Sequence, residues 1–233
     1  MNTKSSISLL FTICDNGSAG ALTEALAGKL NTEKVLELVP ELSLTIGCAQ
    51  NHPAHRMDVY NHTISVIKGL PNDKILRLTA LMHDLGKVST KVVGEDGFDH
   101  FWGHEAVSAD IADRIMKRLG YSSVLTEFVK LLVKYHDYKI DVAELPKAIS
   151  FFGRLLIEDI YSLNEVSGIH GLINEKDAGV FVLNYLFTHQ LSDLNAHSFA
   201  YAKRKRPMLC DLFKCLENEN DLQIHQRYIN NCT

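Results

Sequence analysis

The chain has 233 residues, 46% of them hydrophobic and 22% charged, and a formal net charge of -4 at pH 7. These values are typical of a soluble globular protein with a substantial core. The mildly acidic balance indicates no stable DNA partner, and no apolar stretch is long enough to cross a membrane.

The N-terminus and the cysteines bear on the compartment. The apolar run after Lys4 is interrupted by Ser8 and Thr12, and Asp15 and Asn16 follow where a signal peptide would carry small residues. The five cysteines are odd in number and have no Cys-x-x-Cys spacing, which predicts neither a disulfide framework nor a structural zinc site. We therefore expect free thiols and a cytoplasmic protein without a secretory signal.

Hydrophobic periodicity predicts that most of the chain is helical. The predicted helices cover residues 18–30, 32–39, 58–69, 73–84, 104–119, 123–135, about 146–160 and 175–200. The helix at 73–84 is apolar on nearly every face, which predicts a central, buried position. Asn72 is the expected N-cap of this helix, and Gly86 is its expected C-terminal stop.

Two other segments have a distinct character. Residues 91–101 combine apolar residues with the turn sequence at 94–97, which predicts a small β-hairpin. The basic run at 203–206 is expected to form a solvated helix end that Pro207 terminates, where positive charge is favourable beside the helix dipole. A role of this run in phosphate binding is the alternative.

The candidate chemistry begins with His83-Asp84, at the end of the most buried helix. Burying such a pair is costly unless a metal or a partner compensates. The dipeptide alone is weak evidence, since a second one occurs at His136-Asp137 and a buried His-Asp pair is usually a structural hydrogen bond. His62 on the preceding helix and Asp193 within an apolar helix strengthen the metal hypothesis.

A mixed set of imidazoles and carboxylates suits a divalent ion of intermediate hardness, and Ni, Mn, Co, Mg, Zn and Fe all remain candidates. Because the ligands come from separate helices, the site would lie inside a helical bundle. An open coordination position would hold a water molecule, lower its pKa and make hydroxide available near neutral pH.

The order His62, His83-Asp84, Asp193 resembles the pattern of HD-superfamily phosphohydrolases. The likeness is closer to the HD half of bacterial CCA-adding tRNA nucleotidyltransferases and covers roughly residues 47–200. The segments that carry it are His55-x-x-Asp58-Val59-x-x-His62-Thr63, Leu76-Arg77-Leu78-x-Ala80-Leu81-Met82-His83-Asp84-Leu85-Gly86-Lys87, His100-Phe101-x-Gly103-His104-Glu105, Leu132-Val133-x-x-His136 and Ser192-Asp193-x-x-Ala196-His197.

The resemblance implies an all-α fold, an HD-domain helical bundle with one small β-hairpin insertion. It implies a short helical N-terminal extension packed on the domain at 1–46, an HD phosphohydrolase domain at 47–202, and a basic segment and C-terminal tail at 203–233. The upstream nucleotidyltransferase domain of CCA-adding enzymes is not visible. Only Gly17-Ser18 matches its pattern, without a following Asp-x-Asp, so we expect a stand-alone HD domain that does not add nucleotides.

The resemblance also implies roles for matched residues. The residues expected to hold one metal ion are His62, His83, Asp84 and Asp193. His104 and His136 are expected either to hold a second ion that Asp84 bridges or to contact phosphate directly. Lys87 is expected beside the substrate phosphate. Asp84, Lys87, His104 and His136 are thus the predicted catalytic set, and Asp58 is expected to fix the tautomer of His62.

Simpler interpretations apply to several of these residues. His104 would otherwise be a surface or capping residue, and His136 a partner of a helix dipole. His189 and His197 each lie one turn from Asp193 and either orient it or have no role.

The function predicted from the resemblance is a metal-dependent phosphohydrolase acting through a metal-bound hydroxide. Its substrates would be phosphate esters of nucleotides or RNA termini, as for a 2′,3′-cyclic phosphodiesterase, a nucleotidase or a phosphatase. The alternatives are a free (deoxy)nucleotide phosphatase, a non-catalytic nucleotide-sensing HD module, and a di-iron oxygenase that uses His104 and His136. The pattern specifies neither the oligomeric state nor the base.

Overall fold

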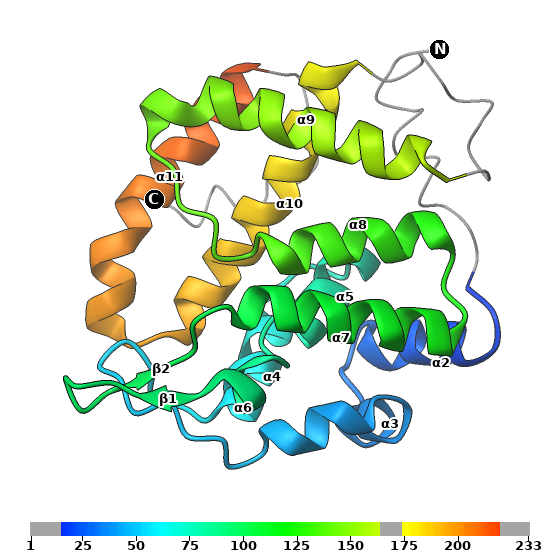
Figure 1. The fold of residues 1–233 in the computed structure, drawn as a ribbon, viewed down its shortest axis with the longest axis vertical. Helices are drawn as coiled ribbons and strands as arrows, with labels where there is room; N and C mark the ends of the chain where they lie inside the picture. The colour runs from blue at the N-terminus through cyan, green and yellow to red at the C-terminus, as the bar shows by residue number, and fades with distance from the viewer. Residues whose placement is uncertain (1–14, 164–173, 220–233) are drawn as a thin grey trace.

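The computed structural model describes residues 15–163 and 174–219, which are almost entirely helical with one short hairpin (Figure 1). This confirms the predicted fold class, an all-α bundle with a small β-hairpin. Residues 1–14, on which most of the signal-peptide expectation rests, lie outside the described part. Among the described helices, none has the length and apolar character that crossing a membrane requires.

The elements follow the predicted order. The helices are α2 (Gly17–Leu26), α3 (Thr32–Leu38), α4 (Val59–Gly69), α5 (Lys74–Met82), α6 (Lys87–Thr90), α7 (His104–Leu119), α8 (Ser123–Lys134), α9 (Leu145–Tyr161), α10 (Glu175–Ala196) and α11 (Phe199–Glu219), with 3-10 turns η1 (Pro40–Thr45) and η2 (Val142–Glu144). Strands β1 (Val92–Val93) and β2 (Asp99–His100) pair antiparallel and form the predicted hairpin.

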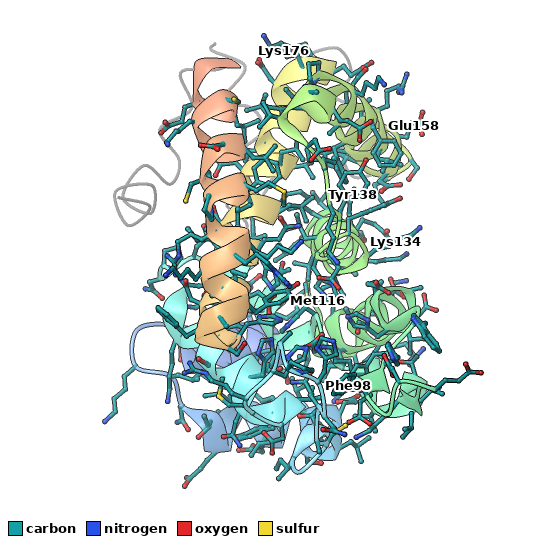
Figure 2. All side chains as sticks on the ribbon, turned by 90° about the vertical axis from the view of Figure 1, so that its left-hand side faces the viewer. Phe98, Met116, Lys134, Tyr138, Glu158 and Lys176 are labelled. Carbon is teal, nitrogen blue, oxygen red and sulfur yellow. The ribbon has the colours of Figure 1, made fainter. Side chains whose placement is uncertain are left out.

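Helix α5 lies at the centre of the fold, as its apolar composition predicts. Every residue from Ile75 to Met82 is buried, and the helix packs against α2, α4, α7, α8 and α10. Helix α9 crosses α10 and packs on it, and α11 packs on α10 as well (Figure 1). Figure 2 shows Phe98 of the hairpin at the end of the molecule opposite Glu158 and Lys176 of the α9–α10 pair.

The structure corrects both expected ends of α5, the N-cap by one residue and the C-terminal stop by more. Asp73, not Asn72, is the N-cap, and its Oδ1 accepts a hydrogen bond from the backbone N–H of Leu76 at 2.9 Å. Gly86 does not stop the helix, because His83 at the C-cap and Gly86 both keep right-handed helical backbone angles. The chain therefore continues through Asp84 and Leu85 directly into α6.

The C-terminal region differs most from expectation. Helix α10 ends at Ala196, because His197 is extended and Ser198 donates its backbone N–H to Ala54 O at 2.7 Å. Helix α11 then runs through Pro207, which therefore does not terminate a helix. A proline inside a helix removes one backbone hydrogen bond. Burial of the α11 side chains Leu209, Leu212, Phe213 and Leu216 in the core offsets this loss.

The expectation of free thiols is wrong at one position. Cys48 and Cys215 are free, whereas Cys210 is disulfide-bonded. Spacing along the chain could not reveal this, because disulfide pairing depends on which thiols the fold brings together.

Helices α9 and α10 cross with their backbones in direct contact. A methyl group added at Gly179 of α10 would overlap the carbonyl oxygen of Ile149, and one at Gly153 of α9 would overlap that of Glu175. Only glycine allows so close an approach. This contact holds α10 directly against α9.

We expect Gly179→Ala to lower the free energy of unfolding by about 2–3 kcal/mol, because the new methyl group forces the two backbones apart. Urea denaturation followed by circular dichroism would measure this. Lys147→Ala, at an exposed position of α9, is the control and should change stability by less than about 0.5 kcal/mol. Equal stability of Gly179→Ala and the wild type would show that the crossing is looser than described.

Candidate metal centre

Seven side chains that the sequence singles out converge at one place in the bundle. They are His62, His83, Asp84, Lys87, His104, His136 and Asp193. They come from the middle of α4, the last turn of α10, the end of α5, the starts of α6 and α7, and the residue that follows Tyr135 at the end of α8. Six of the seven are buried, and the Asp193 side chain is 18% exposed.

The Asp84 carboxylate lies at the centre of the cluster, and each of its oxygens faces a different pair of imidazoles. Oδ2 is 3.2 Å from Nε2 of His83 and 3.7 Å from Nε2 of His62. Oδ1 is 3.3 Å from Nε2 of His104 and 3.9 Å from Nε2 of His136. One carboxylate thus connects two pairs of nitrogen donors.

Asp193 closes one side of this arrangement. Its Oδ1 is 2.7 Å from Nε2 of His62 and 3.8 Å from Nε2 of His83. His197 contacts Asp193 in turn. Its Nδ1 lies 2.8 Å from the backbone oxygen of Asp193 and 3.6 Å from its Oδ2. The first pair of imidazoles therefore lies between two carboxylates.

Three of the imidazoles are oriented by their own chain. Nδ1 of His83, His104 and His136 lies 2.8, 2.9 and 2.7 Å from a backbone oxygen three residues earlier, that of Ala80, Phe101 and Val133. A carbonyl oxygen only accepts, so Nδ1 carries the proton in each ring. In the neutral form of each ring, Nε2 then presents its lone pair to the centre of the cluster.

The cluster contains buried polar atoms that no other group satisfies. Nε2 of His83 and Oδ1 of Asp84 make no hydrogen bond, whereas Oδ2 of Asp84 is paired with the Lys87 ammonium at 2.8 Å. Nε2 of His104 and Nε2 of His136 are only 3.2 Å apart, although each ring uses Nδ1 as its donor. Two facing lone pairs beside a buried carboxylate oxygen that has no hydrogen bond are unfavourable without a cation between them. The donor set therefore fits a divalent metal ion.

The ligand-type atoms also group at distances suited to an ion. His62, His83 and Asp84 contribute atoms that all lie within 4.8 Å of one another, and so do Asp84, His104 and His136. A further group consists of His62, Asp193 and His197.

Electrostatics in the cluster favour ionised carboxylates. Burial opposes ionisation of Asp84, but His83 and Lys87 outweigh it and hold the pKa of Asp84 well below its usual range. Burial likewise opposes ionisation of Asp193, whose pKa is held well below its usual range chiefly by His197 and His62. Burial lowers the pKa of His62, which keeps this imidazole neutral and able to bind a metal.

Lys87 lies against the same carboxylate. Its ammonium is 2.8 Å from Oδ2 of Asp84, donates to Oε1 of Gln50 at 2.9 Å, and lies 5.3 Å from the centre of the Phe101 ring. Gln50 stands where the family resemblance begins, but the sequence analysis assigned it no role. The side chain of Lys87 is thereby held inside the cluster.

The two histidines flanking Asp193 occupy different places. His197 contacts Asp193, whereas the ring of His189 lies 5.0 Å from that of His83 and 6.0 Å from that of His136. Both ring nitrogens of His189 are buried without a hydrogen bond, and burial lowers the pKa of His189 well below its usual value. His189 is thus a neutral imidazole beside the cluster.

The expected role of Asp58 is wrong. Its carboxylate is the N-cap of α4 and accepts from the backbone N–H groups of Asn61 and Gly47, both at 2.8 Å. Both oxygens are engaged by the backbone, so Asp58 does not set the tautomer of His62. One turn of separation is compatible with either role, and the N-cap geometry decides between them.

The family model of the HD domain matches residues 26–166. The A-adding tRNA nucleotidyltransferase of Deinococcus radiodurans is 32% identical over 133 residues, which are 54% of this chain and 30% of that protein. The CC-adding tRNA nucleotidyltransferase of Thermus thermophilus is 35% identical over 104 residues, 42% of this chain and 24% of that protein.

The multifunctional CCA protein of Azoarcus sp. is 35% identical over 114 residues, 46% of this chain and 26% of that protein. The matched part is therefore about a quarter to a third of the length of these curated relatives.

We expect Asp58→Ala to lower the free energy of unfolding by about 1–2 kcal/mol, because two backbone N–H groups lose their acceptor. Asp58→Asn should lose less stability than Asp58→Ala, since its single amide oxygen can still accept from Asn61 as an N-cap while the bond from Gly47 is lost. Urea denaturation of both variants would test this. A loss in Asp58→Asn as large as that in Asp58→Ala would contradict the capping role.

Proposed function

The chain belongs to the HD domain family, and we propose that it is a metal-dependent phosphohydrolase acting on phosphate esters of nucleotides or RNA ends. The observation that carries this proposal is the position of Asp84, whose two carboxylate oxygens face two pairs of imidazole nitrogens. HD domains bind divalent metal ions, and this buried donor set suits one.

The proposed ligands follow from the distances. His62, His83, Asp84 and Asp193 would hold a first ion, and His104 and His136 would hold a second one that shares Asp84. When bound, such an ion supplies Lewis acidity and lowers the pKa of a coordinated water molecule. The surrounding chain supplies rigid placement, because the imidazoles are buried and three of them are fixed to backbone oxygens.

Lys87 would provide the positive charge for the substrate. Its ammonium has three N–H donors, of which Asp84 and Gln50 engage two. No other acceptor in the described part of the chain takes the third, which we assign to a phosphate oxygen. A positive charge held in a buried site stabilises the negative charge that develops as phosphorus is attacked.

The substrate class rests on the relatives as well as on the site. All three relatives are named for CCA or for tRNA nucleotide addition, and this chain matches only part of each. An RNA end or a nucleotide is therefore the proposed carrier of the phosphate ester. A 2′,3′-cyclic phosphodiesterase, a nucleotidase and a phosphatase all use the same attack on phosphorus, and a substrate panel would separate them.

We expect phosphate release that depends on an added divalent ion. The panel is 2′,3′-cyclic AMP, 2′-AMP, 3′-AMP, 5′-dAMP, dATP and bis-p-nitrophenyl phosphate, each with nickel, manganese, cobalt or magnesium. Asp84→Ala should lower kcat/KM by at least about a hundredfold, since it removes the carboxylate common to both groups of ligands. Preference for 5′-dAMP or dATP would identify a free deoxynucleotide phosphatase.

Asp110→Ala is the matched control, because Asp110 is an exposed carboxylate on α7 outside the cluster. It should retain wild-type kcat/KM. Activity that survives in Asp84→Ala would mean that another protein in the preparation is responsible. A metal-loaded wild type without turnover would favour a non-catalytic, nucleotide-sensing module.

We also expect two manganese ions per chain, measured by calorimetric titration and checked by elemental analysis. His104→Ala should bind one, because Oδ1 of Asp84 loses the nearer of its two imidazole partners. His100→Ala is the control and should still bind two, since His100 pairs with Asp96 on the hairpin away from the cluster. A single ion in the wild type would rule out the second site and leave His104 as a phosphate contact.

A further inference from the structure

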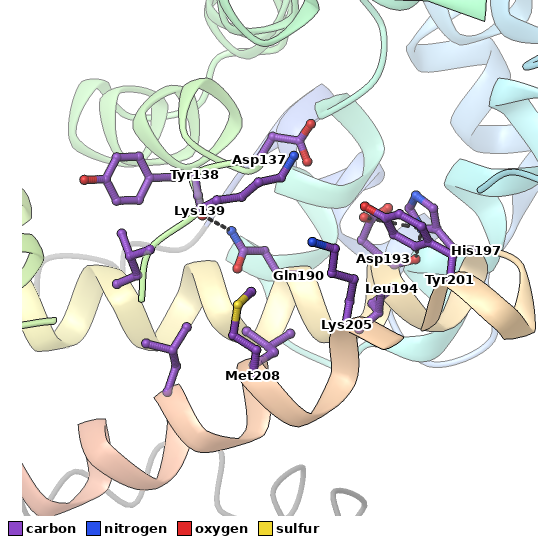
Figure 3. A pocket seen from close by; sticks show the side chains of 13 residues that line it. Asp137, Tyr138, Lys139, Gln190, Asp193, Leu194, His197, Tyr201, Lys205 and Met208 are labelled. Atoms are coloured by element: carbon purple, nitrogen blue, oxygen red, sulfur yellow. Dashed lines mark hydrogen bonds and ion pairs between the residues drawn. The ribbon is translucent and has the colours of Figure 1, made fainter. Parts of the chain in front are cut away.

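A pocket opens beside the metal centre, between residues 137–140, α10 and α11 (Figure 3). One end of the pocket is formed by Asp193 and His197. Asp193 also contacts His62 within the cluster, so the pocket and the candidate metal centre share this wall. The pocket and the candidate metal centre therefore lie on the two sides of the partly exposed Asp193 side chain.

The pocket has an apolar floor and a firmly held wall. The apolar residues that line it are Ile140, Leu194, Met208, Leu209 and Leu212. Gln190 donates through Nε2 to the backbone oxygens of His136 and Tyr138, at 2.9 and 2.8 Å, which ties α10 to the chain after α8. At the end formed by Asp193 and His197, Tyr201 stacks on His197 with ring centres 5.0 Å apart. The pocket therefore presents both apolar and aromatic surface.

Two lysines from different elements provide positive charge at the pocket. Lys139 comes from the chain after α8 and Lys205 from α11, and neither forms an ion pair with a residue in the described part of the chain. In Figure 3 the Lys205 side chain rises from α11 toward the space between Gln190 and Asp193. Lys139 lines the same pocket with its side chain extending toward Asp137, so Lys205 is the lysine that rises into the space and Lys139 adds positive charge at its edge.

The other charged side chains near the pocket are engaged elsewhere. Arg204 lies over the Tyr201 ring and Arg206 is hydrogen-bonded to Asn195, so Lys205 is the member of the basic run 203–206 that lines the pocket. The carboxylate of Asp137 groups with His104 and Glu105, and Figure 3 shows it directed away from Lys205.

We propose that this pocket binds a second phosphate of the substrate, through Lys139 and Lys205, while the scissile phosphate ester lies at the metal centre. The sugar and base between the two phosphates would lie on the apolar floor. This inference rests on the proposed phosphohydrolase function and narrows its substrates to nucleosides with phosphates on both sides. A nucleoside bisphosphate and the 3′ end of an RNA chain share this chemistry.

Lys205 lies on α11, in a part of the chain that the HD family model does not match. Helices α10 and α11 lie outside residues 26–166, the part that the HD family model matches. The pocket therefore combines residues 137–140, which the family model matches, with two helices that it does not match.

Binding can be measured without turnover by calorimetry with the metal chelated. The ligands are adenosine 3′,5′-bisphosphate, 3′-AMP and a short oligoribonucleotide with a 3′-phosphate. We expect the wild type to bind the bisphosphate about tenfold more tightly than 3′-AMP, as for one added charged contact. Lys205→Gln and Lys139→Gln should each remove this difference.

Lys203→Gln is the matched control, because Lys203 is an exposed lysine of α11 that does not line the pocket. It should keep the tenfold difference. Equal binding of the two mononucleotides by the wild type, or a difference that survives in Lys205→Gln, would overturn the proposal without affecting the hydrolase assay. Tighter binding of the oligoribonucleotide than of the bisphosphate, lost in Lys205→Gln, would support an RNA end; the reverse preference would support a mononucleotide.

Discussion

Burial of the Asp84 carboxylate is the constraint on which this structure depends. A carboxylate removed from water is expensive to keep ionised unless positive or polar groups surround it. Here the compensating groups come from four imidazoles and Lys87, carried by separate helices. The central α5 and the turn that leads from it into α6 meet this requirement, because they deliver His83 and Asp84 to the point where the other helices converge.

Helix α10 completes the cluster and links it to the pocket. The direct backbone contact at Gly153 and Gly179 holds α10 against α9, and Asp193 lies further along the same helix. The same helix forms one wall of the pocket. The position of the fourth predicted ligand and the shape of the adjoining pocket therefore both depend on how α10 packs in the bundle.

The sequence was informative where a signal is local or ordered. Periodicity and glycines predicted most helices, and the order of His62, His83-Asp84 and Asp193 predicted which side chains meet; their roles as metal ligands stay predictions. Asp58 shows the limit, since spacing alone cannot separate a helix cap from a contact to His62. Pro207 shows another, because the burial that keeps α11 intact is a property of the whole fold. Gln50 has no periodicity or motif that connects it to Lys87.

The backbone bonds of His83, His104 and His136 have a consequence for how the site arises. Each ring is tied to a carbonyl only three residues away, so its tautomer is determined as soon as that short stretch of chain adopts its shape. The tautomer of each imidazole is therefore set locally, whereas its position in the site requires the assembled bundle. A substitution that shifts one helix would change distances within the site while leaving each imidazole with its lone pair on Nε2, so the chemistry of the donors is more tolerant of sequence drift than their spacing.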